Sequence, residues 1–344
     1  MDFLKHLKEH ENRINKNDLN IILLAHVMEP RGYKNKEQLQ CSDTERFSID
    51  EFNEIYQGIV NAGYYIQSVY FNEIDFINEY LMHPDRFSNC LIYNLFRNGA
   101  GYNKKTVIPA FCELVGLRYS TSSSLACAVC RNKYYFSILL QKHNIPVPRS
   151  WFLLSDGNWL SDSPQTGTKV ICKPASESAS QGINNSHIFY SDHDSYKQFK
   201  GSEYIVQEFI DGKECEVPVI KISNDIIVFP PVGIDLHTHQ IMDEECSTNY
   251  DYGFYSIQNV LSPQTINIIT KYAKEAFLVL KMEVYGRIDF RIDIYGNPYI
   301  FDISTTPYTT SHSSFSYSFN EESLGYSDIY NAIIIASLYR NIYT

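Results

Sequence analysis

The first third of the chain alternates short apolar runs with longer amphipathic segments. The runs at 20–27 and 90–96 have the length of buried strands. Residues 48–63 begin with a capping Ser, carry apolar residues at helical spacing and stop at a Gly, and 106–116 has the pattern of a shorter helix. Strands and helices in alternation predict a parallel sheet with flanking helices. We therefore predict an N-terminal α/β domain over residues 1–118.

The rest of the chain divides into two further predicted domains, 119–206 and 207–344. The central one should hold one or two helices within 124–144. Strands then follow around one short helix, at 150–154, 168–176, 187–192 and 203–210. The C-terminal one has a more antiparallel pattern, with strands at 214–222 and 225–234, a long helix at 262–281, a hairpin from 286 and a closing helix at 327–342. The predicted fold class is α/β, becoming α+β in the C-terminal part.

The hairpin GRIDFRIDIYGNPYIFDIS, 286–304, carries charged residues on alternate positions. Because side chains at i and i+2 share a face, Arg287 and Asp289 lie on one side, as do Asp302 and Ser304. A turn at Tyr295-Gly296 sets Asp289 opposite Asp302, whereas a turn one residue later sets it opposite Ser304. Either register brings the two carboxylates within roughly 4.5–8 Å. That arrangement suits a Mg²⁺ site, or a solvated face on which Asp and Arg form cross-strand pairs.

Composition removes several function classes. The net charge of −11 argues against a general binder of nucleic acid or of anionic membranes. The charged N-terminal stretch lacks the apolar core of a signal peptide, and the longest apolar runs are too short to span a bilayer. The eight cysteines are scattered, and the single C-x-x-C, Cys127 to Cys130, lies in a predicted helix. We expect a cytoplasmic protein with reduced thiols.

Four stretches occur together in one order: KVICKPASESASQGI (169–183), YIVQEFIDGKECEV (204–217), GRIDF (286–290) and DISTTPYTTSHS (302–313). They are preceded by NKYYFSILLQKHNIPVPRSW (132–151). This series resembles the ATP-grasp superfamily and, within it, the D-alanine–D-alanine ligase branch. The resemblance covers about residues 90–340 and implies an ATP-grasp fold, with the N-terminal parallel sheet as a substrate-contacting domain.

The resemblance also implies roles for individual residues. Lys133 and Lys173 would neutralise ATP phosphates, under a loop at 176–182 that includes Ser178 and Ser180. The adenine and ribose would be held by Gln207, Glu208, Phe209, Ile210 and Glu214. Magnesium, as one or two ions, would be bound by Asp289, Asp302 and Ser304. Arg287 would stabilise the oxyanion of the tetrahedral intermediate, and Lys173 and Ser313 would also take part in catalysis. The acceptor would be held by Ser313 and Ser314, beside Tyr308.

Several positions depart from the family pattern. Asp302 stands in place of Glu, Ser304 in place of Asn, and Tyr308 in place of a Gly. The mobile lid has Ser247 and Thr248 where the family has Lys and Tyr, and the N-terminal element that contacts the first D-alanine is not recognisable. Nucleotide and metal positions are therefore mostly kept, while donor positions are changed.

The resemblance therefore implies a ligase that uses ATP and Mg²⁺ to join a carboxylic acid to an amino acid through an acylphosphate, in a peptide or natural-product pathway. The donor is expected not to be D-alanine. Two alternatives remain, a non-catalytic nucleotide-binding relative that acts as a regulator or scaffold, and a true D-alanine–D-alanine ligase. The expected partners are small carboxylic acids and amino acids, with a homodimer as a further implication of the resemblance, and with no nucleic acid or membrane.

Overall fold

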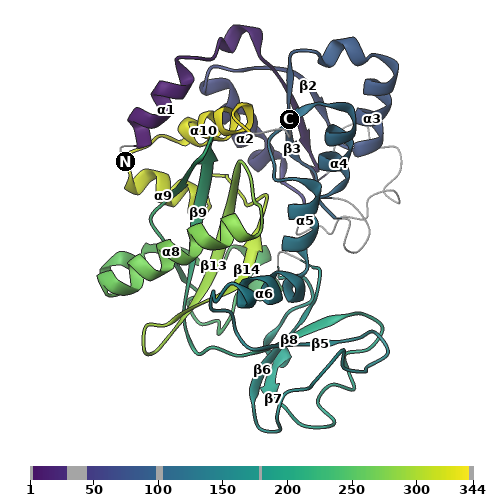
Figure 1. Ribbon diagram of the computed structural model, residues 1–344, viewed down its shortest axis with the longest axis vertical. Coiled ribbons are helices and arrows are strands. Elements are labelled where there is room, and N and C mark those ends of the chain that lie inside the picture. The colour runs from purple at the N-terminus through teal and green to yellow at the C-terminus, as the bar shows by residue number, and fades with distance from the viewer. Residues whose placement is uncertain (1–2, 29–44, 98–103, 178–179, 341–344) are drawn as a thin grey trace.

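The computed structural model describes residues 3–28, 45–97, 104–177 and 180–340. Three sheets follow one another along the long axis of the molecule (Figure 1). The helices are α1 Phe3–Glu11, α2 Ile49–Asn61, α3 Glu73–Met82, α4 Val107–Val115, α5 Ser124–Arg131, α6 Lys133–Lys142, α7 Glu244–Asn249, α8 Pro263–Val279, α9 Ser314–Glu321 and α10 Tyr326–Leu338. The strands of the first two sheets are β1 Asn20–Ala25, β2 Tyr65–Tyr70, β3 Cys90–Leu95, β4 Arg118–Tyr119, β9 Gly212–Ile222, β10 Asp225–Val228, β11 Val232–Asp235, β12 Gly253–Ser256, β13 Tyr285–Asp293 and β14 Pro298–Ser304. Those of the third are β5 Ser150–Leu153, β6 Lys169–Pro174, β7 Ile188–Tyr190 and β8 Tyr204–Glu208.

The N-terminal sheet is parallel, in the order β2-β1-β3-β4, which confirms the predicted alternation. Its central strands β1 and β3 are buried almost throughout, as their apolar runs require. Helix α2 begins at a capping box, in which the Ser48 hydroxyl accepts from the Glu51 amide and the Glu51 carboxylate accepts from the Ser48 amide. Two loops that follow β1 and β3 reach the large cavity described below.

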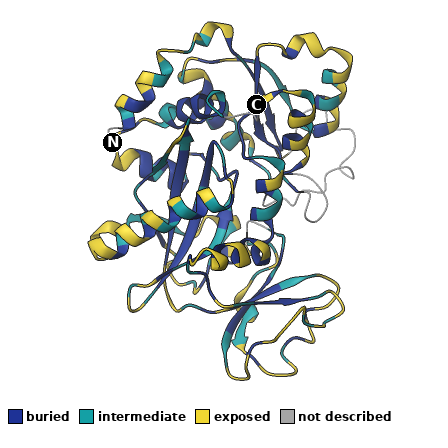
Figure 2. Cartoon of the chain, viewed as in Figure 1, coloured by how far each residue is buried: buried dark blue, intermediate teal, exposed yellow. Residues whose placement is uncertain are grey.

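The middle sheet is antiparallel and is built around the long strand β9. Strand β13 pairs with β9 over nine positions and with β14 on its other side. The stretch predicted as one strand at 225–234 is split into β10 and β11, because Pro230 and Pro231 lie between them and a proline cannot donate to a ladder. Helix α8 packs against this sheet. Figure 2 shows exposed residues along α8 and mostly buried residues along the strands of this sheet.

The third sheet, in the order β5-β8-β6-β7, is antiparallel and projects at the lower end of the molecule (Figure 1). Its small core includes Trp151, Leu153 and Val206. The short helix predicted among these strands is wrong: within the described part of 175–203 there is only a 3₁₀ turn at Asn185–His187. The Asp192 carboxylate accepts hydrogen bonds from two amides of the following loop, which favours a turn over a helix.

The predicted division into three domains stays a prediction. Its boundary at 118/119 lies within β4, and the boundary at 206/207 lies within β8. Helix α10, near the C-terminal end of the described chain, packs against α2 of the N-terminal part and against β9. One hydrophobic core therefore contains residues from both parts of the chain. None of the helices in the described ranges has the length and apolar character needed to cross a bilayer.

The contact between α2 and α10 depends on a glycine. Gly58 faces the ring of Tyr330, and a Cβ at this position would overlap that ring. The Tyr330 hydroxyl donates to the carbonyl of Thr309, in the loop that follows β14. The ring therefore has little freedom to move away.

Gly58→Ala should lower the free energy of unfolding by about 1–3 kcal/mol, because it overpacks this contact. An ordinary helical Gly→Ala change raises stability by up to about 1 kcal/mol, so the expected sign is opposite. Urea denaturation measures the difference. Gln57→Ala, at an exposed position of the same helix, is the control and should change stability by about 0.5 kcal/mol or less. A stabilised Gly58→Ala protein would contradict the packing described.

Candidate active site

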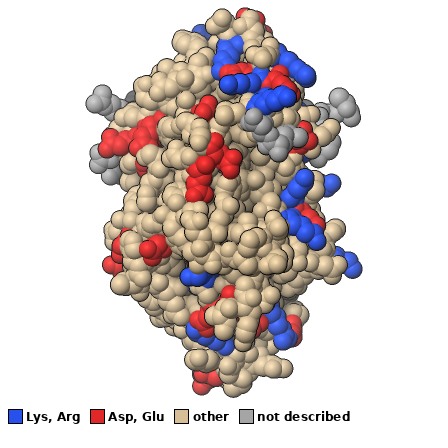
Figure 3. Space-filling model, turned by 90° about the vertical axis from the view of Figure 1, so that its left-hand side faces the viewer, with Lys and Arg blue, Asp and Glu red and all other residues tan. Residues whose placement is uncertain are grey.

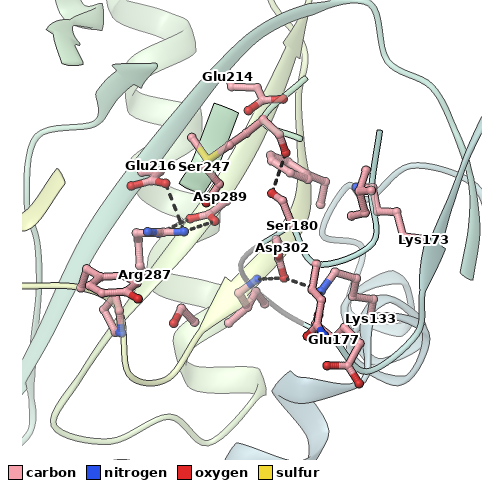
Figure 4. A pocket seen from close by; sticks show the side chains of 18 of the residues that line it. Lys133, Lys173, Glu177, Ser180, Glu214, Glu216, Ser247, Arg287, Asp289 and Asp302 are labelled. Atoms are coloured by element: carbon pink, nitrogen blue, oxygen red, sulfur yellow. Dashed lines mark hydrogen bonds and ion pairs between the residues drawn. The ribbon is translucent and has the colours of Figure 1, made fainter. Parts of the chain in front are cut away.

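A cavity of about 360 Å³ is lined by residues of the middle and third sheets and by loops that follow strands of the N-terminal sheet. This volume is in the range of small-molecule sites. Figure 4 shows the carboxylates and lysines that converge on it. On the protein face drawn in Figure 3, the described lysines and arginines lie among acidic side chains rather than in one continuous basic patch.

Three carboxylates form a row across β9, β13 and β14. Glu216 is paired with Asp289, and Asp289 is paired with Asp302 on its other side. Asp289 therefore lies opposite Asp302, the first of the two pairings left open by the sequence, and a bulge directly after Asp289 shifts the register nearer the turn. Ser304 lies opposite Arg287 and also lines the cavity. Neighbouring like charges of this kind require cations between or beside them.

Arg287 supplies the cation on one side of the row. Its guanidinium donates to both oxygens of Asp289, at 2.8 and 2.7 Å, and lies 3.1 Å from a Glu216 oxygen. Burial nevertheless raises the pKa of the Asp289 carboxyl to about 7, against the opposing effect of Arg287. Asp302 differs: burial opposes its ionisation, yet Lys133 and Lys173 hold the pKa of this carboxyl below its usual value.

Lys133 and Lys173 approach the row from the other side. The Lys133 ammonium, at the start of α6, lies 3.4 Å from an Asp302 oxygen and donates to the carbonyl of Glu177 at 2.8 Å. Lys173 is buried at the end of β6, with its ammonium 4.8 Å from the centre of the Phe301 ring. Burial lowers the pKa of Lys173 to about 8, although Asp302 favours its charged form. Both lysines predicted to bind phosphate line the cavity.

The loop after β6 is docked onto the segment before α7. Ser180, at φ +53°, donates from its hydroxyl to the carbonyl of Met242 at 2.6 Å. The Gly182 amide donates to the Glu244 carboxylate, and the Glu244 amide donates to the carbonyl of Ile183. Ser178 lies outside the described residues. Ser247 and Thr248 line the cavity from α7, so the segment with the altered lid residues covers the site.

The residues predicted to bind adenine and ribose follow one another along β8 and into β9, and all of them line the cavity. Gln207 is fully buried and donates from its amide to the Ser150 hydroxyl. The Phe209 ring is in contact with the cations of Lys169 and Arg291. Glu214 is buried and lies 3.0 Å from Arg291, whereas Glu208 is exposed and Ile210 is half-buried. Burial raises the pKa of Glu214 above its usual value, with Arg291 opposing.

The predicted acceptor residues lie at the start of α9. The Ser313 hydroxyl is used within the fold, since it caps α9 by accepting from the Ser316 amide and donates to the carbonyl of Thr310. Ser314 is buried beside it, and its hydroxyl has no partner among the described residues. Tyr308 lines the same region, and a wall of Tyr250, Tyr252, Phe254 and His312 rings lies nearby. Ser314 is therefore better placed than Ser313 to donate to a ligand.

Several charged residues that line this cavity are not predicted from the sequence. Glu216 was overlooked although it lies two residues after Glu214, and alternation along a strand was the signal that could have found it. Glu45, Arg97, Lys105 and Arg131 also line the cavity, and the first three come from loops that follow parallel strands. The carboxyl ends of parallel strands are where ligands commonly bind. This rule could have identified the loops after β1 and β3 as part of the site.

The donor set of the predicted metal site was compared with the needs of Mg²⁺. Among the described residues, no group of three or more His, Cys, Asp or Glu side chains is arranged to hold a metal alone. Mg²⁺ usually takes one or two carboxylates and completes its shell with water and phosphate oxygens. Asp289 and Asp302 fit that requirement, and a carboxylate has about four lone-pair directions, so Asp289 can keep its bonds to Arg287. The residues present therefore fit Mg²⁺ together with a phosphate ligand.

Comparison with known proteins accounts for this arrangement. A family model described as the D-ala D-ala ligase C-terminus matches residues 139–335, more than half of the 344-residue chain. The chain belongs to this family. The matched stretch includes β9, β13 and β14, so the row of three carboxylates lies inside the family's domain.

Individual members of the family are similar over much of the chain. A D-alanine–D-alanine ligase of Marinomonas sp. (strain MWYL1) is 28% identical over 203 residues, which are 58% of this chain and 62% of that enzyme. The chain thus matches about three fifths of the length of that relative. A D-alanine–D-alanine ligase of Francisella philomiragia is 24% identical over 274 residues, 77% of this chain and 84% of the enzyme.

The fold is shown by a solved structure. The D-alanine–D-alanine ligase of Bacillus anthracis, in a crystal structure with ATP, superposes with a TM-score of 0.66. The alignment covers 93% of this chain and 97% of that one at 18% identity. The predicted fold class, an ATP-grasp fold behind an N-terminal parallel sheet, is confirmed. The roles of the individual site residues stay predictions.

Replacing Arg287 tests the charge balance of the site. Arg287→Met should lower the free energy of unfolding by about 3 kcal/mol at pH 8 in EDTA, because two buried carboxylates lose their counter-ion. Without Arg287 the pKa of Asp289 should rise further, so the folded protein binds more protons than the unfolded chain, and the deficit should shrink as the pH falls to 6. Urea denaturation at both pH values measures this. Arg287→Lys, which keeps the charge, is the control. Equal deficits at pH 8 and pH 6 would point to lost packing instead.

Proposed function

We propose that this protein is an ATP- and Mg²⁺-dependent ligase that joins a carboxylic acid to the amine of an amino acid. The observation that carries the proposal is the pairing of Asp289 with Asp302, flanked by Arg287 and by Lys133 and Lys173 in one cavity. Two adjacent carboxylates suit a divalent cation, and the cationic side chains beside them suit a polyphosphate bound to that cation. Membership in the D-alanine–D-alanine ligase family supports the same reading.

Asp289 and Asp302 would hold the metal, with the Ser304 hydroxyl as a weaker third partner. Mg²⁺, when bound, neutralises phosphate charge and orients the phosphates for in-line transfer. Lys133 and Lys173 would contact phosphate oxygens, and the loop that contains Ser180 would cover them and keep out water. The adenine would lie against Phe209, between the small sheet and β9, with Glu214 near the ribose hydroxyls.

The reaction has two steps. An oxygen of the donor carboxylate bonds to the γ-phosphorus of ATP while the bond from that phosphorus to the bridging oxygen breaks, and ADP leaves. The amine nitrogen of the acceptor then bonds to the acyl carbon, the bond from that carbon to the phosphate oxygen breaks, and the amine gives up a proton. Arg287 would stabilise the negative oxygen of the tetrahedral intermediate. Ser314, with Ser313 as part of the helix start, would hold the acceptor carboxylate.

The donor is proposed not to be D-alanine. The lid segment has Ser247 and Thr248 in place of the family's Lys and Tyr, and Tyr308 fills the position of a glycine. Glu45, which is buried in the loop after β1, is within 4 Å of Arg131 and Lys104 rather than open to a substrate ammonium. A dimer through the N-terminal part stays a prediction from the resemblance.

Turnover is expected to depend on the carboxylate pair. Purified protein with ATP and Mg²⁺ should release ADP and phosphate when a correct acid and amine are both present, with a product mass equal to their sum minus water. EDTA should abolish release, and Asp302→Ala should reduce it by at least about 100-fold, equivalent to about 3 kcal/mol. Glu275→Gln, at a position on α8 that does not line the cavity, is the control. Unchanged release by Asp302→Ala, or clear ATP binding with no turnover on any acid, would favour the non-catalytic alternative.

Nucleotide affinity is expected to depend on Lys173 and on pH. Lys173→Gln should weaken binding of a non-hydrolysable ATP analogue about tenfold or more, because a charge-assisted hydrogen bond is lost. Since the free protein has a Lys173 pKa of about 8, affinity should fall as the pH rises from 7.5 to 9.5. Lys173→Arg, which stays charged, should remove that fall. Titration calorimetry measures each affinity, with the exposed Lys142→Gln as control. Identical pH profiles for wild type and Lys173→Arg would exclude this contact.

A further inference from the structure

The N-terminal end of the cavity carries a second set of charges, apart from the carboxylate row. Its basic members are Arg46, Arg97, Lys105 and Arg131, and its acidic members are Glu45 and Glu177. They come from the loops after β1 and β3, from α5 and from the loop after β6. Within the described residues, basic groups therefore outnumber acidic groups at this end.

Both acids are already neutralised by the protein itself. Glu45 lies 3.1 Å from Arg131 and 3.7 Å from Lys104, and Glu177 lies 2.5 Å from Lys104 and 3.4 Å from Arg131. The four side chains form a closed ring of alternating charge. Glu45, Lys104 and Arg131 are also deeply buried. A substrate ammonium would have to break this ring to reach either acid, so an amine is a poor match for this end of the cavity.

Lys105 lies outside the ring and faces the cavity. Among the described residues, its ammonium has no ion pair within 4 Å and no hydrogen bond. Its backbone is held at φ +67°, an unfavourable region that surrounding structure must maintain. Burial, together with repulsion from Arg97 and Arg131, lowers the pKa of Lys105 to about 7, and Glu45 only partly opposes this. An amine in such surroundings is stabilised by an anion placed next to it.

Arg97 is held rigidly beside the same space. Its guanidinium lies between the rings of Phe47 and Tyr308, at 4.8 and 4.2 Å from their centres, and donates to the carbonyl of Thr306. The charges that act on Lys105 are those of this end, whereas Asp302 responds to Lys133, Lys173 and Arg287. The basic end is therefore a neighbour of the proposed phosphoryl-transfer site and not part of it.

We propose that the donor acid carries a second carboxylate, which binds to Lys105 and Arg97 while its first carboxylate is phosphorylated beside Asp302. The inference rests on the proposed ligase function and names its donor class, a dicarboxylic acid. Two cations of different geometry suit a carboxylate, which Arg97 can approach through its planar N–H groups and Lys105 as a point charge. Residues 305–308, which line the same cavity as Lys105 and Asp302, would lie beside the donor.

The test compares two donors that differ in one charge. Glutarate and glutaramate have nearly the same shape, but the amide end of glutaramate is neutral. With ATP, Mg²⁺ and a mixture of amino acids, glutarate should give at least tenfold higher kcat/KM for ADP release. Equal use of both donors, or a preference for D-alanine, would overturn the inference and leave the ligase function standing.

Variants of Lys105 locate the effect. Lys105→Gln should lower kcat/KM for glutarate about tenfold or more, mainly through KM, and leave both the affinity for an ATP analogue and the activity with glutaramate unchanged. Lys105→Arg should keep the preference for glutarate over glutaramate and extend it above pH 7, where the wild-type protein loses this preference because Lys105 deprotonates. The charged and titratable groups that act on Lys105 are Arg97, Arg131, Glu45 and Cys127. A weakened ATP affinity with an unchanged KM for glutarate would assign Lys105 to phosphate instead.

A binding measurement without turnover distinguishes failure of the ligase function from failure of the anion site. Calorimetry with an ATP analogue and Mg²⁺ present should detect glutarate but not glutaramate, and Lys105→Gln should remove that signal. If glutarate binds in this way and no acid is turned over, the ligase function fails and the anion site stands. If neither donor binds better than the other and Lys105→Gln changes nothing, the anion site is excluded. Lys142→Gln, an exposed lysine, controls for the loss of one positive charge.

Discussion

The row of carboxylates across β9, β13 and β14 is the constraint on which the rest of the site depends. Glu216, Asp289 and Asp302 lie next to one another in paired strands, at spacings where like charges repel. Arg287 compensates from within the same sheet, but Lys133 and Lys173 come from α6 and from the small third sheet. Full balance of the row therefore requires both α6 and the small sheet to be docked against the middle sheet. Electrostatics and fold are linked through these few side chains.

This balance has a consequence for ligands. A divalent cation alone would add positive charge beside Lys133 and Lys173, and a polyphosphate alone would add negative charge beside Asp289 and Asp302. Each separate addition is opposed in a cavity of low dielectric, where such interactions are strong. Added together, the two largely cancel. In the proposed function, Mg²⁺ and ATP are therefore expected to bind cooperatively.

The features that could be predicted from the sequence are local ones. Alternation in 286–304 gave the hairpin and the shared face of its two carboxylates, because strand periodicity is fixed by the backbone. The register needed the structure, since both turns were compatible with the sequence. Ser313 illustrates another limit: its position matched a family motif, yet its hydroxyl caps α9. Serine is used both to cap helices and to bind ligands, so the residue type alone does not distinguish the two roles.

The donor end could not be predicted for a different physical reason. Glu45, Arg97 and Lys105 come from loops that follow two different parallel strands, and Arg131 comes from the end of α5, so they meet only because the fold brings these segments to one edge of the sheet. No periodicity relates them, and an acid–base ring has no sequence signature. The two ends of the cavity thus follow different rules. Paired strands of the middle sheet fix the carboxylates proposed to hold the metal, whereas loops of the N-terminal sheet carry the groups proposed to select the donor. Loops can change their charges without disturbing a strand register. A chain of this family can therefore keep the chemistry of the C-terminal strands while its donor changes from one that offers an ammonium to one that offers a second carboxylate.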